Sequence, residues 1–173
     1  FNFKKGSEVI TPALTFSTSV ACLVKNDLVP VFVDVEPRTF NIDPKKIEEM
    51  ISDKTVAILA PNLMGNICKW DEIKVIADKY DLKIIEDSAD TLGATINGKS
   101  SGFYSDMSIT SFYGSHIINC AGNGGALAIN DEEAMKKAKL LRSWGRSSSL
   151  FDEQSESIEN RFKKQQDTYN YYI

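Results

Sequence analysis

The chain has 173 residues, of which 42% are hydrophobic and 25% are charged, and its formal net charge is −4. These values are typical of a globular protein and allow one domain with a sizeable core. The mild acidity argues against nucleic acid as a partner, because phosphate neutralisation needs a basic face. No apolar run approaches the ~18 residues of a membrane span.

The first half of the sequence alternates apolar runs with amphipathic segments. A helix is predicted over 18–26, and the Asp43-Pro44 pair is predicted to open another, since Asp caps a helix and Pro fits its first turn. The helix over 18–26 should bury one apolar face, formed by Val20, Leu23 and Val24. Three strands are predicted, at EVITP (8–12), PVFVDV (30–35) and TVAILAP (55–61).

The second half continues the alternation. A helix is predicted over 71–80, burying Ile73, Ile76 and Ala77 at three- and four-residue spacing. Asn97-Gly98 favours a two-residue hairpin turn. Three more strands are predicted, at LKIIED (82–87), MSITSF (107–112) and GALAI (125–129).

The last predicted helix begins near residue 130. Asn130 is predicted as its cap, with Glu133 three residues later as in a capping box, and Gly145 should end it. Strands rich in Val and Ile that alternate with helices predict an α/β fold, with a mostly parallel sheet covered on both faces. No internal repeat is present in the sequence.

The cysteines and the chain ends bear on the cellular compartment and on whether the chain is part of a larger protein. Cys22, Cys68 and Cys120 form no Cys-x-x-Cys pair, which is typical of reduced and mostly buried thiols, and no secretory signal opens the chain. We therefore expect a cytoplasmic protein. The chain begins at Phe1 rather than methionine, and its last stretch is polar and irregular before an aromatic cluster. We expect it to be part of a larger protein.

Polar groups follow several of the predicted strands, where ligands of parallel sheets bind. Asp34 follows one strand, Glu86-Asp87 ends another and is followed by Asp90, and Ser111 leads to His116, the one histidine in the chain. The acidic pair fits either a solvated strand exit or helix cap, or a carboxylate that faces a cationic ligand atom. The histidine fits either a backbone-bonded loop residue or a catalytic group.

A glycine cluster follows the histidine. Gly122, Gly124 and Gly125 fit a turn that needs positive φ. The run GNGG is not GxGxxG, and no such motif follows the first strand, so a dinucleotide site has little support.

Several motifs carry a resemblance in their order. IIEDSADTLGATINGKSSG, SDMSITSFYGSHIINCAGNGGALAI, EVITPALTFSTSVACLVKNDLVPVFVDVEPRTFNID, PNLMGN and LLRSWGR together resemble the sugar aminotransferase family of pyridoxal-phosphate enzymes, over roughly residues 6–150. That resemblance implies the aspartate aminotransferase fold (fold type I). It also implies that residues 1–146 are part of the cofactor-binding large domain and that 147–173 connect toward a small C-terminal domain.

Two departures from the common pattern select a branch of this family. Most members end the SFYGSH motif in a lysine that binds the cofactor covalently, whereas this chain has His116. The acidic block reads ED-x-x-D, with Asp90 where aminotransferases usually have glutamine. Both features resemble the nucleotide-sugar 3-dehydratases, which act on 4-keto-6-deoxyhexoses in 3,6-dideoxy sugar and lipopolysaccharide biosynthesis.

The resemblance also implies roles for individual residues. Asp87 would face the protonated pyridine nitrogen of pyridoxal or pyridoxamine phosphate, which makes the ring a better electron sink. Phe16 would stack on the ring, Ser111 would bind the phosphate and Asp90 would lie near the phenolic oxygen. His116 would be the general base, since imidazole is largely neutral near pH 7.

The same resemblance implies partners. A nucleotide sugar is the expected substrate, a homodimer the expected assembly and glutamate a candidate amino donor. No iron–sulphur cluster is expected, because the three cysteines lack cluster spacing and Ser147, Ser148 and Ser149 stand where cluster-bearing relatives have cysteine. Two alternatives stay open, namely an ordinary sugar aminotransferase and a catalytically silent nucleotide-sugar-binding relative.

Overall fold

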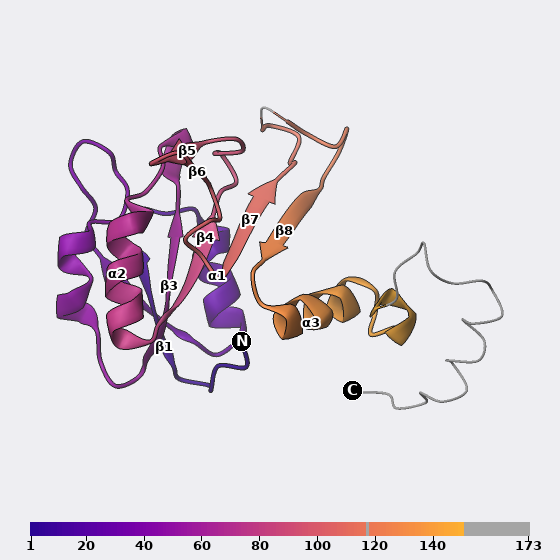
Figure 1. Ribbon diagram of the computed structural model, residues 1–173, viewed down its shortest axis with the longest axis horizontal. Helices are drawn as coiled ribbons and strands as arrows, with labels where there is room; N and C mark the ends of the chain where they lie inside the picture. Colours follow the sequence, from indigo (N-terminus) through magenta and orange to yellow (C-terminus); the bar gives the residue numbers. More distant parts are fainter. Residues whose placement is uncertain (117, 151–173) are drawn as a thin grey trace. The chain divides into compact units, whose positions relative to one another are not determined.

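The computed structural model describes residues 1–116 and 118–150, which fall into two units, Phe1–Asn130 and the chain from Asp131 onward. The first unit carries a six-stranded sheet in the order β2-β1-β3-β4-β7-β8 (Figure 1). All neighbours are parallel except β8, which pairs antiparallel with β7. The strands are β1 (Glu8–Pro12), β2 (Val29–Val33), β3 (Thr55–Pro61), β4 (Lys83–Asp87), β7 (Met107–Ser111) and β8 (Gly125–Ile129).

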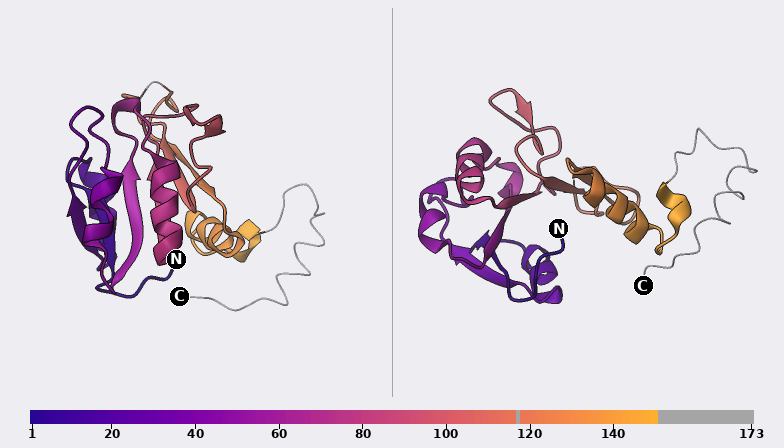
Figure 2. Two further views of the ribbon diagram at one scale, coloured as in Figure 1. Left: turned by 60° about the vertical axis from the view of Figure 1, so that its left-hand side comes forward. Right: turned by 60° about the horizontal axis from the view of Figure 1, so that its bottom comes forward.

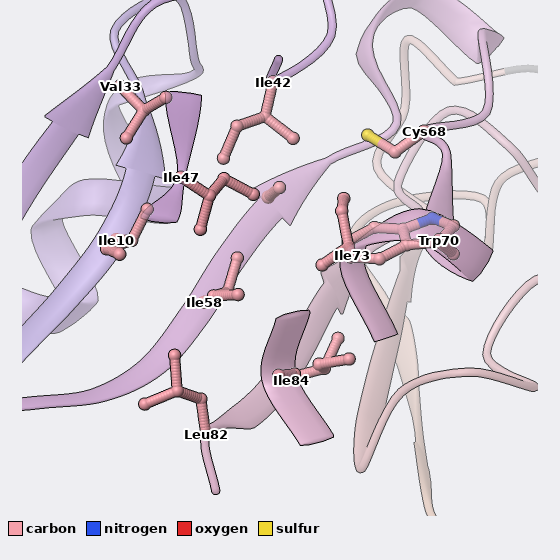
Figure 3. Packing of buried hydrophobic residues seen from close by; sticks show 12 residues of the cluster. Ile10, Val33, Ile42, Ile47, Ile58, Cys68, Trp70, Ile73, Leu82 and Ile84 are labelled. Atoms are coloured by element: carbon pink, nitrogen blue, oxygen red, sulfur yellow. The ribbon is translucent and has the colours of Figure 1, made fainter. Parts of the chain in front are cut away.

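Two helices cover opposite faces of this sheet because side chains alternate along each strand. Ile58 of β3 lies in the core beneath α2 (Trp70–Tyr80), together with Trp70 and Ile73 (Figure 3). The neighbouring β3 residues Ala57 and Leu59 point to the other face, where α1 (Ser17–Lys25) supplies its buried Leu23. The expected sheet between helices is therefore present.

The face of α1 differs from the prediction. Leu23 is buried, but Val24 is 60% exposed, and Ser19 is buried in its place. Burial of Ser19 is possible because its hydroxyl donates a hydrogen bond to Asp87. In α2 the predicted face is right, with Ile73 and Ala77 buried.

Short elements connect the strands. Asp43 does cap, accepting a hydrogen bond from the Lys45 N–H, but the predicted helix is only two 3₁₀ turns, η1 (Pro44–Lys46) and η2 (Glu48–Met50), which flank the fully buried Ile47. A third turn, η3, covers Leu63–Gly65. The Asn97-Gly98 hairpin is confirmed, joining β5 (Thr95–Ile96) to β6 (Lys99–Ser100), and both turn residues have positive φ.

The second unit contains α3 (Glu132–Arg142) and the turn η4 (Ser147–Leu150). The predicted cap was wrong by one residue, since Asp131 accepts the hydrogen bond from the Ala134 N–H. Asn130 instead donates to the carbonyls of Gly102 and Ser105, which fixes the end of β8. Most of the predicted connection over 147–173 lies outside the described residues.

Figure 2 shows the fold from two further sides. The chain passes from β1 to β2 on one side and returns to β3 on the other, so the order reverses at β1. Such a reversal opens a crevice at the carboxyl ends of the strands, where α/β proteins bind ligands.

No helix within the described part of the chain is long and apolar enough to cross a bilayer.

Candidate active site

A cleft of about 670 Å³ lies at the carboxyl ends of β1, β3, β4 and β7. Each of these strands leads into a loop that lines it, so four segments far apart in sequence meet there. All five residues predicted for the site are among its lining residues, namely Phe16, Asp87, Asp90, Ser111 and His116. The structure thus brings the predicted residues together, while their chemical roles remain predictions.

Asp87 ends β4 and is held at both carboxylate oxygens. Its Oδ2 accepts from the Ser19 hydroxyl at 2.7 Å, and its Oδ1 accepts from the Ala89 N–H at 3.1 Å. Among the residues that line the cleft in the described chain, none is a lysine or an arginine. The carboxylate is therefore fixed in orientation without a cationic neighbour in the cleft, and it retains lone pairs for a cationic ligand atom.

Asn62 fixes the segment that carries Asp87 through several hydrogen bonds. It follows β3, is 1% exposed, and its backbone N–H donates to the Asp87 carbonyl at 2.9 Å. Its side-chain Oδ1 accepts from the Cys68 N–H and from Trp70 Nε1, both at 2.8 Å. Its Nδ2, which carries two hydrogens, lies 2.8–3.2 Å from three buried oxygens, on Glu86, Ser88 and Thr91.

Glu86 completes this buried network. Its side chain is fully buried, yet it accepts from the Asn62 amide, from the Ser88 hydroxyl at 2.6 Å and from the Gly102 N–H at 2.8 Å. Three donors satisfy a buried carboxylate without a cation. The two halves of the acidic pair therefore differ, since Glu86 is structural and Asp87 faces the cleft.

His116 lies about one quarter exposed at the other side of the cleft. Its Nδ1 is 3.2 Å from the Ser111 carbonyl oxygen, and its Nε2 is 3.6 Å from Asp90 Oδ1. The Tyr113 ring meets the imidazole edge-on, with the ring centroids 6.0 Å apart. The two interpretations of His116, as a backbone-bonded loop residue and as a catalytic group, are therefore compatible, because Nδ1 lies against a backbone carbonyl and Nε2 lies near a carboxylate.

Phe16 and Ser111 occupy the cleft in different ways. Phe16 precedes α1 and is 67% exposed. The Ser111 hydroxyl accepts from the Tyr113 N–H at 3.2 Å. As an aromatic face and a hydroxyl at one cleft, they suit a flat ligand that carries a polar group.

Other predicted groups behave differently. Asp34 does not line the cleft and instead lies 3.1 Å from Lys46, where a hydrogen bond from the Val35 N–H and this lysine lower the pKa of its carboxyl.

Gly122, Gly124 and Gly125 have no positive φ, so the predicted turn with positive φ was wrong. Two of them are required by space, since a Cβ at Gly124 would lie 2.7 Å from Cys120 Sγ and one at Gly125 would lie 3.0 Å from a backbone oxygen.

Sequence reasoning missed three cleft residues or their supports. Ser19 was hidden because a polar residue on an otherwise apolar helix face gives no pattern of its own. Asn62 directly follows a buried strand, so the rule that selected Asp87 would also have selected it. Thr15 also lines the cleft, and its buried hydroxyl oxygen has no hydrogen-bond partner among the described residues.

Comparison with known proteins identifies relatives that match most of the chain. The model of the DegT/DnrJ/EryC1/StrS aminotransferase family matches residues 1–168. GDP-perosamine synthase of Caulobacter vibrioides is 42% identical over 81% of the chain, and lipopolysaccharide biosynthesis protein RfbH of Salmonella typhimurium is 43% identical over 83%. These matches cover 38% and 32% of the relatives, so the chain spans about a third of their length.

Solved structures agree with this result. E. coli GDP-4-keto-6-deoxy-D-mannose-3-dehydratase, solved with bound hydrated PLP, superposes with a TM-score of 0.84 and 32% identity. The match covers 98% of the chain and 43% of that structure. The predicted fold class is confirmed.

Proposed function

The chain belongs to the DegT/DnrJ/EryC1/StrS aminotransferase family, and from this premise we propose that its full-length protein is a 3-dehydratase of a nucleotide-linked 4-keto-6-deoxyhexose. The family includes pyridoxal-phosphate enzymes of both kinds, dehydratases and aminotransferases, in deoxysugar and lipopolysaccharide biosynthesis. One observation carries the choice between them. His116 lines the cleft at the position where the resemblance expects a lysine, and no lysine of the described chain lines it.

The cleft suits pyridoxal or pyridoxamine phosphate. Asp87, fixed at both oxygens and without a cationic neighbour in the cleft, suits a protonated pyridine nitrogen. The exposed Phe16 ring suits a flat aromatic partner. The Ser111 hydroxyl and the unpartnered Thr15 hydroxyl are available to a polar group. When bound, this cofactor supplies an electron sink that acidifies an adjacent C–H bond.

The chain's own residues then have distinct tasks. Asp87 binds and orients the ring, and Ser19 holds Asp87 through its 2.7 Å hydrogen bond. His116 acts as general base and accepts the proton of the C–H bond that the bound cofactor would acidify. Departure of the 3-hydroxyl of the sugar follows. A lysine at this position would also move a proton, but it would capture the aldehyde form of the cofactor covalently. A histidine keeps the base and removes that tether.

The aminotransferase alternative has its own support. A transaminase of Aneurinibacillus thermoaerophilus is 40% identical to the chain and a 3-dehydratase of Saccharopolyspora spinosa is 39% identical, so identity alone does not separate the two activities. We propose a homodimer and glutamate as amino donor for either activity. The products differ, since dehydration leaves a 3-deoxy ketone and transamination leaves a 4-amino sugar that keeps its 3-hydroxyl.

A product assay tests the choice. Purified full-length protein is incubated with pyridoxal phosphate, glutamate and GDP-4-keto-6-deoxymannose or a dTDP analogue, and the sugar is identified by mass spectrometry. We expect the 3-deoxy ketone from the natural protein. His116→Asn should lower its rate by about 10²–10⁴-fold, the usual contribution of a general base, while cofactor absorbance is retained. Formation of only the 4-amino sugar would refute the dehydratase assignment.

His116→Lys provides the complementary variant. It restores an amine at the same position, so we expect covalent cofactor attachment and a shift toward the 4-amino sugar. Dehydration by His116→Asn at the natural rate would show that another group is the base.

A further inference from the structure

His116 has an acceptor opposite each of its two ring nitrogens. The Ser111 carbonyl oxygen lies 3.2 Å from Nδ1, and Asp90 Oδ1 lies 3.6 Å from Nε2. A carbonyl oxygen accepts hydrogen bonds and never donates them. Nδ1 therefore carries a proton in this arrangement, whichever protonation state Nε2 adopts.

The consequence concerns which nitrogen reacts. In the neutral ring the proton on Nδ1 leaves the lone pair on Nε2. When Nε2 takes up a proton the ring becomes a cation, and an oxygen of the Asp90 carboxylate lies 3.6 Å from that nitrogen. A carboxylate at ion-pair distance stabilises that cation relative to the neutral ring.

We infer that His116 accepts its proton at Nε2 and that Asp90 is the charge partner that stabilises the resulting imidazolium. This inference rests on the proposed function, because it assigns atoms to the base of that reaction. It gives Asp90 a task different from the cofactor contact that the sequence suggested. The proton count closes within the pair, since one proton moves from carbon to Nε2, Nδ1 keeps its own, and a +1 ring faces a −1 carboxylate.

The fold holds Asp90 in place for this task. Its neighbour Thr91 is buried and accepts a hydrogen bond from Asn62. On the other side the left-handed Gly65 lies against it, since a Cβ there would be 3.2 Å from the Asp90 carbonyl oxygen. The side chain itself is 48% exposed, so solvent weakens the pair without abolishing it.

The other groups around the imidazole leave Asp90 as the nearest charge. Tyr113 presents its ring, and Ser111 presents its carbonyl. Asp87 lines the same cleft but is engaged by Ser19, and no cation of the described chain lines the cleft. His116 and Asp90 also line a second cavity of about 410 Å³ beside the first, whose other described lining residues are uncharged.

The first test reads the tautomer directly. Full-length protein labelled with ¹⁵N-histidine is studied by long-range ¹H–¹⁵N correlation spectra, and the His116 signals are those lost in His116→Asn. We expect Nδ1 protonated and Nε2 unprotonated at alkaline pH. A proton on Nε2 in the neutral ring would overturn the inference, and this readout does not depend on which sugar product the enzyme forms.

The second test measures single-turnover dehydration against pH. Asp90→Asn should slow it about 10-fold and move its acidic limb to lower pH, because the imidazolium loses its partner. Asp90→Glu keeps the charge and should restore most of the rate. Asp27→Asn removes a charge of similar exposure from the α1–β2 turn, outside the cleft, and should change neither quantity.

The outcomes separate this inference from the proposed function. Weaker cofactor binding in Asp90→Asn with an unmoved pH limb would mean that Asp90 contacts the cofactor, and the charge-partner role would be wrong. Natural dehydration by Asp90→Asn would likewise overturn it and leave the proposed function standing. A protein that forms only the amino sugar would refute the proposed function, whereas the tautomer spectrum would still test the assignment of Nε2.

Discussion

Asn62→Ala should be among the most destabilising single substitutions in this chain. The substitution removes two acceptor bonds, so the Cys68 N–H and Trp70 Nε1 lose their partners while both residues stay at most 1% exposed. Each unsatisfied buried donor costs about 1–3 kcal/mol, which gives about 2–6 kcal/mol for the pair. Glu86 also loses one of its three donors. The total compares with about 5–15 kcal/mol for the stability of a typical protein.

Urea unfolding of the cofactor-free full-length protein, followed by far-UV circular dichroism, measures this loss. Asn119→Ala is the matched control, since Asn119 is exposed and its side chain accepts one hydrogen bond, from the Ala121 N–H. We expect the control to stay within about 1 kcal/mol of the natural protein. Equal losses in the two variants would refute the reasoning that the buried network holds the cleft.

Asn62→Asp sharpens the test through pH. It keeps an oxygen for the Trp70 donor but puts a second carboxylate oxygen about where Nδ2 stood, 2.8 Å from Glu86. Two carboxylates this close do not both ionise readily, so one of the pair has a raised pKa in the folded variant. A raised folded pKa means that stability is present at low pH and lost as the pH rises through it. The free energy of unfolding of the variant should therefore approach that of the natural protein on acidification. A difference between the two that does not change with pH would contradict this.

Three further outcomes are expected. Without a lysine at the His116 position, pyridoxal phosphate should dialyse away from the full-length protein, and borohydride should fix little of it; a stable attachment to a native lysine would contradict the base assignment. Burial raises the pKa of the Cys68 thiol, so iodoacetamide should label the exposed Cys120 in the folded protein and reach Cys68 only on unfolding, as peptide mass spectrometry would show. A hydrogen bond from Lys69 at 2.5 Å lowers the pKa of Glu36. This pair therefore stabilises the fold at pH values above the usual pKa of a glutamate, and the stabilisation is lost as the pH falls through the lowered pKa. Lys69→Met should accordingly destabilise the protein slightly near neutral pH and not at all in strong acid, as measured by urea unfolding.

The sequence by itself determined the elements and their class. Apolar runs, several of them rich in Val and Ile, predicted all six strands of the sheet, and Asn97-Gly98 predicted the hairpin, because strand propensity and turn geometry are local properties. The rule that ligands bind beyond the carboxyl ends of parallel strands selected residues that do line one cleft. His116 was likewise conspicuous in the sequence alone.

Tertiary structure decided whatever depends on contacts between distant segments. Val24 faces outward and Ser19 inward because the Ser19 hydroxyl meets Asp87, 68 positions away in the chain. The acidic pair split into a structural Glu86 and a cleft-facing Asp87 because Asn62 and Gly102 reach one of them and not the other. Helical periodicity and capping preferences describe one segment at a time, so they carry no information on which distant donor or acceptor a polar side chain will find once the strands are assembled.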